Sequence, residues 1–228
     1  CKVRTRAVFA AVVLIGYSLL MYLVVAPDAP DGTDPLSVAG NIAGWVDRQW
    51  LPGTFACGSF DPEGLLSTLP AIVSALFGMF TGEFLLRKRS SLSGEQIALC
   101  MALAAVAITV IGIIWNCWIP INKKLWSSSF TCVVTGYSLG LFALFYYLID
   151  VRGWRRWTLF FRVVGLNSIT IYLAQRIVGF GRISDFFLGG VASKCPEALA
   201  AVVDSAGYVA VCWLFLYFLY RKNVFLKV

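Results

Sequence analysis

Histidine is absent from this chain of 228 residues, and charged residues make up only 14% of it. The first absence excludes a histidine base, nucleophile or metal ligand within the chain. The second excludes an ordinary soluble domain, in which about 25% of residues are charged. The sequence also has no CxxC pair, dinucleotide-binding glycine motif, P-loop or nucleophile elbow. We therefore expect no metal site.

Apolar residues dominate what is present: they form 59% of the chain, and the mean hydropathy is +0.79. This composition predicts an integral membrane protein that is embedded in a lipid bilayer. The net charge of +7 arises from 19 basic and 12 acidic residues. Because the basic residues cluster between apolar runs, we interpret them as topology signals and expect no nucleic-acid partner.

Six apolar runs are long enough for membrane helices, which need about 20 residues each. They cover residues 7–25, 65–86, 97–115, 126–149, 158–178 and 199–220. The predicted fold is all-α: a polytopic bundle of six transmembrane helices that forms one domain over residues 1–228. With the N-terminus inside, 13 of the 19 basic residues face the cytoplasm, so both termini are predicted to be cytoplasmic.

The first outer loop, residues 26–64, is too long for a simple connection. Within it, residues 37–51 place apolar side chains at helical spacing, and Ser37 is a suitable N-cap. This pattern predicts a short amphipathic helix on the outer surface, either packed on the helix ends or acting as a lid; packing is favoured. Cys57 and Cys195 both fall in predicted outer loops, so the sequence allows a disulfide between them without establishing it.

Polar residues gather in three places. Asp61, Pro62 and Glu63 are typical of a helix start, yet two carboxylates at a membrane mouth are also suited to binding an amine or sugar hydroxyls. Asn122 to Ser129 bring lysines and serines into the entrance of a helix, where polar groups should face protein or water. In the run 158–178, polar residues form a stripe along one face of the predicted helix, and Asn167 lies beside that stripe. These residues either form hydrogen bonds with neighbouring helices or line a cavity.

Five motifs occur in order: FDPEGLLSTLPAIVSALFGMFTGEFL, INKKLWSSSFTC, YLIDVRGW, GLNSITIYL and YRKNVFLKV. Together they resemble the C-terminal portion of the heparan-alpha-glucosaminide N-acetyltransferase family and its bacterial relatives of unknown function. That resemblance implies a membrane acyltransferase of about eleven helices, of which this chain is the later part, in a bacterial inner membrane. It also implies transfer of an acetyl or other acyl group from cytoplasmic acetyl-CoA to an amino sugar or glycan on the outer side.

The family's catalytic histidine lies before the matching region, so the resemblance implies that this chain alone is inactive without that N-terminal half. The resemblance implies acetyl-CoA as the co-substrate. It leaves open whether the protein forms a homodimer. The expected acceptor-binding residues are Asp61, Glu63, Asn122, Lys123, Lys124, Trp126, Ser128 and Asn167. The residues expected to contact CoA phosphates are Arg87, Lys88, Arg155, Arg156, Arg221 and Lys222. The alternative interpretation is that these basic residues only determine the membrane topology. The alternative functions are a transporter and a non-catalytic membrane scaffold.

Overall fold

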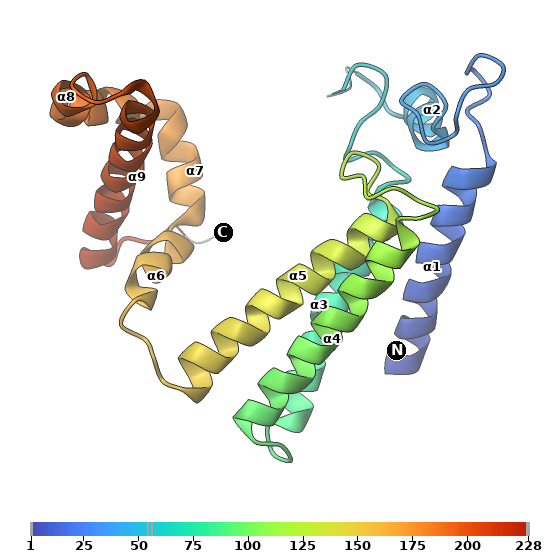
Figure 1. Cartoon of the computed structure of the whole chain (residues 1–228), viewed down its shortest axis with the longest axis horizontal. Helices are drawn as coiled ribbons and strands as arrows, with labels where there is room; N and C mark the ends of the chain where they lie inside the picture. The colour runs from blue at the N-terminus through green and yellow to red at the C-terminus, as the bar shows by residue number, and fades with distance from the viewer. Residues whose placement is uncertain (1, 54, 56, 227–228) are drawn as a thin grey trace. The chain divides into compact units, whose positions relative to one another are not determined.

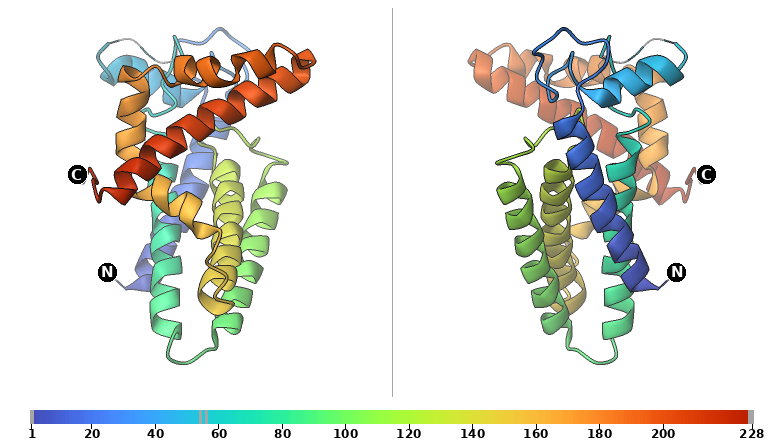
Figure 2. Two further views of the ribbon diagram at one scale, coloured as in Figure 1. Left: turned by 90° about the vertical axis from the view of Figure 1, so that its left-hand side faces the viewer. Right: turned by 90° about the vertical axis from the view of Figure 1, so that its right-hand side faces the viewer.

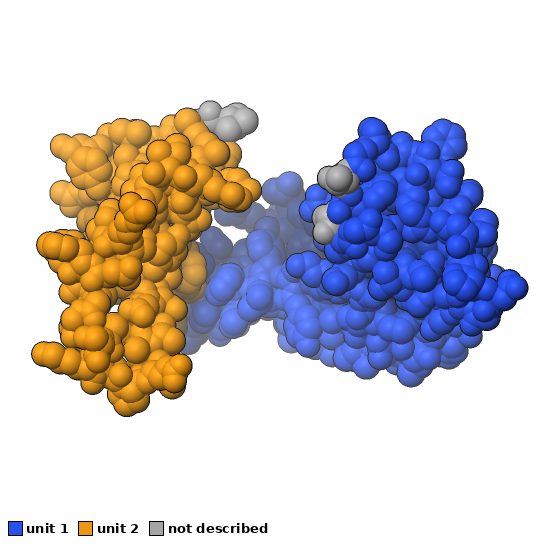
Figure 3. All heavy atoms as spheres, turned by 90° about the horizontal axis from the view of Figure 1, so that it is seen from above, with its two compact units in different colours: residues 1–153 blue, residues 154–228 orange. Residues whose placement is uncertain are grey.

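The computed structural model of the protein describes residues 2–53, 55 and 57–226, which form nine α-helices and one π-helical turn and contain no strand. Lys227, which the count of 19 basic residues includes, lies outside the described residues, as does Cys1. The chain divides into two compact units, Cys1–Gly153 (unit 1) and Trp154–Val228 (unit 2), which Figure 3 colours separately. Each unit is described by itself.

Unit 1 is built on four long helices. Its elements are α1 (Val3–Leu23), α2 (Ile42–Trp50), α3 (Thr68–Lys88), α4 (Gly94–Trp115), α5 (Ser128–Tyr146) and the π-helical turn η1 (Tyr147–Val151). The four long helices run alternately up and down (Figures 1 and 2). A short turn at residues 89–93 joins α3 to α4 at one end, called the hairpin end. Residues 24–67 and 116–127 cover the other end, called the loop end.

The contact between α4 and α5 is the most extensive in unit 1. Gly136 makes it possible, because a Cβ there would collide with Thr109 and with the carbonyl oxygen of Ala105. Gly112 has the same effect nearer the loop end, where a Cβ would meet Val133 at 2.7 Å. Small residues let helix backbones approach closely, which is a common way to pack helices in a membrane.

The described residues of unit 2 form four helices that follow one another closely in the sequence. They are α6 (Thr158–Leu166), α7 (Ser168–Ile177), α8 (Phe180–Ala192) and α9 (Glu197–Arg221). Both α8 and α6 pack against α9. At the first contact Gly207 lies so close to Ser184 and Leu188 that a Cβ would collide with both side chains.

Five helices of the described residues are long and apolar enough to cross a membrane: α1, α3, α4, α5 continued by η1, and α9. The predicted all-α membrane bundle is confirmed. The predicted fifth span, residues 158–178, is wrong as a continuous helix. It is two short helices, α6 and α7, because Asn167 leaves the helical conformation at φ −129° and ψ 29°. The helix α8 was not expected at all.

Two predicted helix starts are also wrong. The amphipathic helix begins at Ile42, and its N-cap is Asn41, whose Oδ1 accepts the N–H of Gly44 at 2.6 Å. Ser37 instead accepts the N–H of Gly40 in a preceding turn. The next long helix begins at Thr68, because the segment from Asp61 onward folds into turns.

Candidate functional site

Both long segments of the loop end meet in one apolar cluster. Its buried members come from the last turns of α1, from α2 and from residues 116–127: Tyr17, Met21, Ile42, Ala43 and Leu125. Leu36, Trp45 and Leu66 pack against it from partly buried positions. The loop at residues 24–67 and its helix α2 are therefore packed onto the helix ends, which supports the packing interpretation of the amphipathic helix.

Long-range hydrogen bonds attach α1 to the end of the loop at residues 116–127 and to the start of α5. The hydroxyl of Tyr17 donates to the carbonyl oxygen of Leu125 at 2.6 Å, and that of Ser128 donates to the carbonyl oxygen of Leu14 at 2.8 Å. Ser128 is fully buried. The structure thus uses this predicted acceptor-binding residue to hold α1 against the start of α5.

Ser127 organises the residues around it through one hydroxyl group. Its Oγ donates to the carbonyl oxygen of Pro120 at 2.8 Å and accepts the N–H of Asn122 at 3.0 Å. The same oxygen accepts the N–H of Phe130 as the N-cap of α5 and lies 3.0 Å from Oγ of Ser129. The run of serines that the sequence could not explain in lipid therefore closes a loop and caps a helix.

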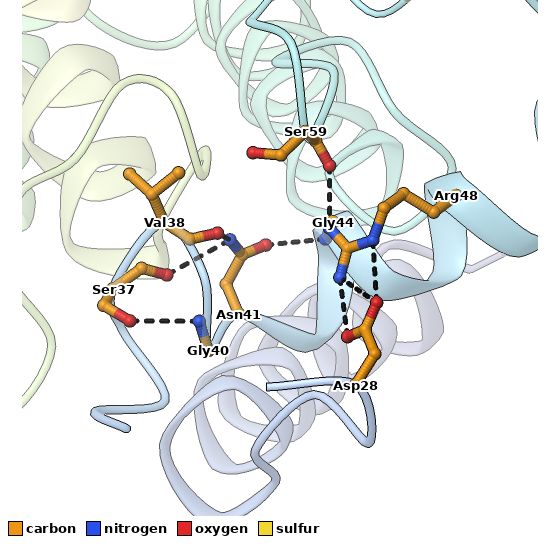
Figure 4. Close-up of polar contacts among 8 residues, drawn as sticks. All are labelled: Asp28, Ser37, Val38, Gly40, Asn41, Gly44, Arg48 and Ser59. Carbon is orange, nitrogen blue, oxygen red and sulfur yellow. Dashed lines mark hydrogen bonds and ion pairs between the residues drawn. The ribbon is translucent and has the colours of Figure 1, made fainter. Parts of the chain in front are cut away.

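Polar contacts fix the first loop around α2 (Figure 4). Arg48 bonds Asp28 through two nitrogens and donates from Nη1 to the carbonyl oxygen of Ser59 at 2.7 Å. Asn41 spans the turn before α2 by donating to the carbonyl oxygen of Val38 at 2.8 Å. These bonds join residues that are up to 20 positions apart in sequence, so the loop has a defined structure.

Asp47 is a buried carboxylate that the sequence analysis missed. Only 1% of the residue is exposed, and its Oδ1 accepts the N–H of Leu65 at 2.9 Å. Gly64 is required beside it, because a Cβ there would collide with the carboxylate. The available signal was helical spacing, which places Asp47 four residues after the buried Ala43 on the inner face of α2.

The two predicted carboxylates differ in their surroundings. Asp61 is half-buried, and its Oδ1 accepts the N–H of Glu63 at 2.9 Å, which closes a turn. Glu63 has an exposed side chain at the surface of the loop end. Of this pair, Glu63 is the carboxylate that is free to meet a ligand from solution.

The second predicted group surrounds a very small cavity. Asn122 lines it together with Tyr17, Ser18 and Ser127, and its volume is about 30 Å³. That space is suited to a water molecule and is too small for a sugar. Lys123 and Lys124 are exposed, so an acceptor at this end would lie on the surface of the loops.

Trp126 has an unusual conformation within this group. Its φ of 49° lies in the left-handed region, which is rare for a bulky residue and costs free energy. Its ring packs edge-on against Phe130 at 5.4 Å between centroids. The indole N–H is buried and has no hydrogen-bond partner among the residues that the structure describes.

The predicted CoA-binding residues fall in both units. Arg87 and Lys88 are exposed at the hairpin end of unit 1, where Nη2 of Arg87 lies 3.7 Å from Glu83. Glu83 also pairs with Arg6, and this contact was not predicted. The other four residues, Arg155, Arg156, Arg221 and Lys222, belong to unit 2 and are exposed.

Unit 2 adds an aromatic row near the end of α9. Trp213 stacks on Phe160 and on Tyr217, with centroids 5.7 and 5.0 Å apart. Arg221 lies 3.5 Å from the Tyr217 hydroxyl, and Arg162 lies over the ring of Tyr220 at 5.7 Å. Because the rings of Tyr217 and Tyr220 also stack, with centroids 6.4 Å apart, the aromatic row links Arg221, one of the predicted residues, to a second arginine.

Asn167 lies at the junction between α6 and α7, and only 1% of it is exposed. Its Oδ1 accepts a hydrogen bond from the Thr170 hydroxyl at 3.3 Å, whereas its Nδ2 has no partner among the described residues. Cys57 and Cys195 carry free thiols, and they belong to different units.

Taken together, the long apolar helices define an all-α integral membrane protein whose polar loops are packed on one end of unit 1. No protein-family model matches the chain. It is similar to the heparan-alpha-glucosaminide N-acetyltransferases of Homo sapiens and Mus musculus, with 29% identity to each over 205 residues. The match covers 83% of this chain, and the chain spans about 30% of the length of these curated relatives. This protein is thus a distant relative of those enzymes.

Proposed function

We propose that this chain is part of a membrane acyltransferase that moves an acetyl or other acyl group from acyl-CoA to an amino sugar. The observation that carries the proposal is the alignment, over 83% of the chain, with two proteins named as N-acetyltransferases. The membrane helices support it, because they allow a donor and an acceptor to approach from opposite faces of a bilayer.

The amine must lose its proton before it can attack a thioester, so the reaction needs a general base. The chain has no histidine. The buried carboxylate of Asp47 already accepts the N–H of Leu65. We therefore propose that the base comes from residues outside these 228, and that this chain supplies binding groups for the donor and acceptor.

The proposed acceptor surface is the loop end of unit 1, where Glu63, Lys123 and Lys124 are exposed. The proposed donor contacts are the exposed arginines and lysines at the hairpin end and in unit 2, since guanidinium groups bind phosphates well. With the N-terminus inside, the hairpin end faces the cytoplasm and the loop end faces outward.

The test uses the natural protein that carries this sequence, reconstituted in lipid nanodiscs. Labelled acetyl-CoA and glucosamine should yield N-acetylglucosamine and free CoA, and calorimetry should detect acetyl-CoA binding. The 228-residue chain alone should bind acetyl-CoA and give no turnover. Absence of acetyl-CoA binding by both proteins would refute the proposal.

A transporter is the second candidate, and the break at Asn167 is the observation in its favour. Discontinuous membrane helices form substrate sites in many transporters. Proteoliposomes that contain the protein distinguish the two functions. A transporter would accumulate labelled glucosamine unchanged, whereas an acyltransferase would convert it only when acyl-CoA is supplied.

A further inference from the structure

The junction between α6 and α7 is a helix break made by one residue. Asn167 is both the last cap of α6 and the first cap of α7. Its N–H donates to the carbonyl oxygen of Val164 at 3.1 Å, and its own carbonyl oxygen accepts the N–H of Ile171 at 3.0 Å. As at any helix start, the first N–H groups of α7 have no partner within that helix.

The side chain of Asn167 adds a second donor at the same point. Its amide lies against the first turn of α7, because Oδ1 accepts the Thr170 hydroxyl. The Nδ2 atom is buried and has no partner among the described residues. A buried amide donor without a partner is unfavourable, so its retention is explained if a ligand oxygen completes it.

The chemistry of the break selects the ligand. An amide N–H and the positive end of a helix dipole both favour an oxygen that carries partial or developing negative charge. The nearest basic residue before the break, Arg162, is directed over the ring of Tyr220. The donors at the break are thus dipolar groups without a formal charge, which is suited to the neutral carbonyl oxygen of a thioester.

We propose that Asn167 and the first turn of α7 bind the carbonyl oxygen of the acyl donor. This inference rests on the proposed acyltransferase function. In that reaction the amine nitrogen bonds to the thioester carbon, the carbon–sulfur bond breaks, and the amine proton passes through the base to the departing thiol. Negative charge builds on the carbonyl oxygen between these events, where a fixed donor stabilises it most.

The experiment compares acetyl-CoA with CoA, which differs by lacking the carbonyl group. Calorimetry on the natural protein should show acetyl-CoA binding about three- to tenfold tighter than CoA, as expected for one added hydrogen bond. Asn167→Ala should abolish that preference while leaving the affinity for CoA unchanged. Asn167→Asp keeps the acceptor for Thr170 but removes the donor, and should have the same effect.

Ser184→Ala is the matched control, because the Ser184 hydroxyl in α8 is also buried and has no partner in the described part of the chain. It should keep the preference for acetyl-CoA. If neither ligand binds the natural protein, the acyltransferase function fails. If both bind and Asn167→Asp retains the preference, the function stands and the role of Asn167 is refuted.

A spectroscopic measurement covers the case in which both variants fail to fold. Acetyl-CoA labelled with carbon-13 at the carbonyl is bound to the natural protein, and its infrared stretch is compared with that of the free ligand. A shift to lower wavenumber is expected from the donated hydrogen bonds. An unshifted carbonyl band would overturn the inference.

Discussion

Arg48 and Asp28 form a two-pronged ion pair, in which Nε and Nη2 of the arginine lie 3.0 and 2.7 Å from the carboxylate oxygens. This pair connects the segment directly after α1 to α2. The third arginine nitrogen, Nη1, donates to the carbonyl oxygen of Ser59, so one side chain holds three parts of the first loop.

Removing this pair should loosen the loop while leaving the helices intact. A double-mutant cycle with Asp28→Ala and Arg48→Ala should give a coupling free energy of about 0.5–1 kcal/mol, since the pair is partly exposed. Limited proteolysis within residues 26–64 should also accelerate. Asp31→Ala, an exposed carboxylate in the same loop, serves as the control and should cleave at the normal rate.

Gly64 and Asp47 should show strong coupling. Gly64→Ala should lower the free energy of unfolding by about 1–3 kcal/mol, because the new methyl group collides with the carboxylate. Asp47→Ala should cost about 1–3 kcal/mol by leaving the Leu65 N–H without its acceptor. Thermal unfolding of the double variant should show less loss than the two single losses added, and simple additivity would contradict the contact.

Gly136 and Gly140 provide a matched pair on α5. Gly136→Ala should destabilise unit 1 by about 1–3 kcal/mol, because its methyl group has no room between α5 and α4. Gly140→Ala should be neutral or stabilising, since its methyl group makes only an ordinary contact with Ala105 at 3.6 Å. Melting temperatures in detergent check both, and equal losses would argue against this packing.

Glu63→Gln should reduce acyl transfer in the natural protein. An exposed carboxylate that binds the amine or hydroxyls of the acceptor makes a charge-assisted hydrogen bond, whose loss costs about tenfold in kcat/KM. The melting temperature should stay unchanged. Glu95→Gln, an exposed acid at the hairpin end, should keep full turnover; if Glu63→Gln does the same, Glu63 has no role at the acceptor surface.

The orientation of unit 1 can be measured by cysteine labelling after the seven cysteines of the chain are replaced by alanine. A reagent that cannot cross membranes should label Asp31→Cys at the loop end in intact cells. It should reach Ser91→Cys at the hairpin end only after the cells are opened. The reverse pattern would place the N-terminus on the outside.

Periodicity and length predict the long helices well, because each needs only an apolar run of sufficient extent. The predictions of helix starts fail where a residue interacts with another that is distant in the sequence. Asp61 and Pro62 resemble a helix start, yet the helix begins at Thr68, since Gly64 must first pass beside the buried Asp47. The hydrogen bond from the Leu65 N–H to Asp47 joins positions 18 apart and leaves no local signal.

The sequence indicates less about the surroundings of the candidate site residues than about the fold. The sequence identified Asn167 as unusual, but not that it divides a helix, because an asparagine in an apolar run is compatible with a continuous helix. Ser128 was predicted to bind an acceptor, whereas its hydroxyl is used by the carbonyl oxygen of Leu14. A polar residue at the start of a helix can bind a ligand or hold a neighbouring helix, and only its hydrogen-bond partner distinguishes these two roles.

The hydroxyl of Ser127 has a consequence for how the loop end opens. One oxygen holds the amides of Asn122 and Phe130, one in the loop and one in the first turn of α5. When Ser127 moves, both amides lose this hydrogen bond together. Hydrogen exchange at the two positions should therefore proceed through a single opening event, so that residues 120–130 behave as one cooperative segment.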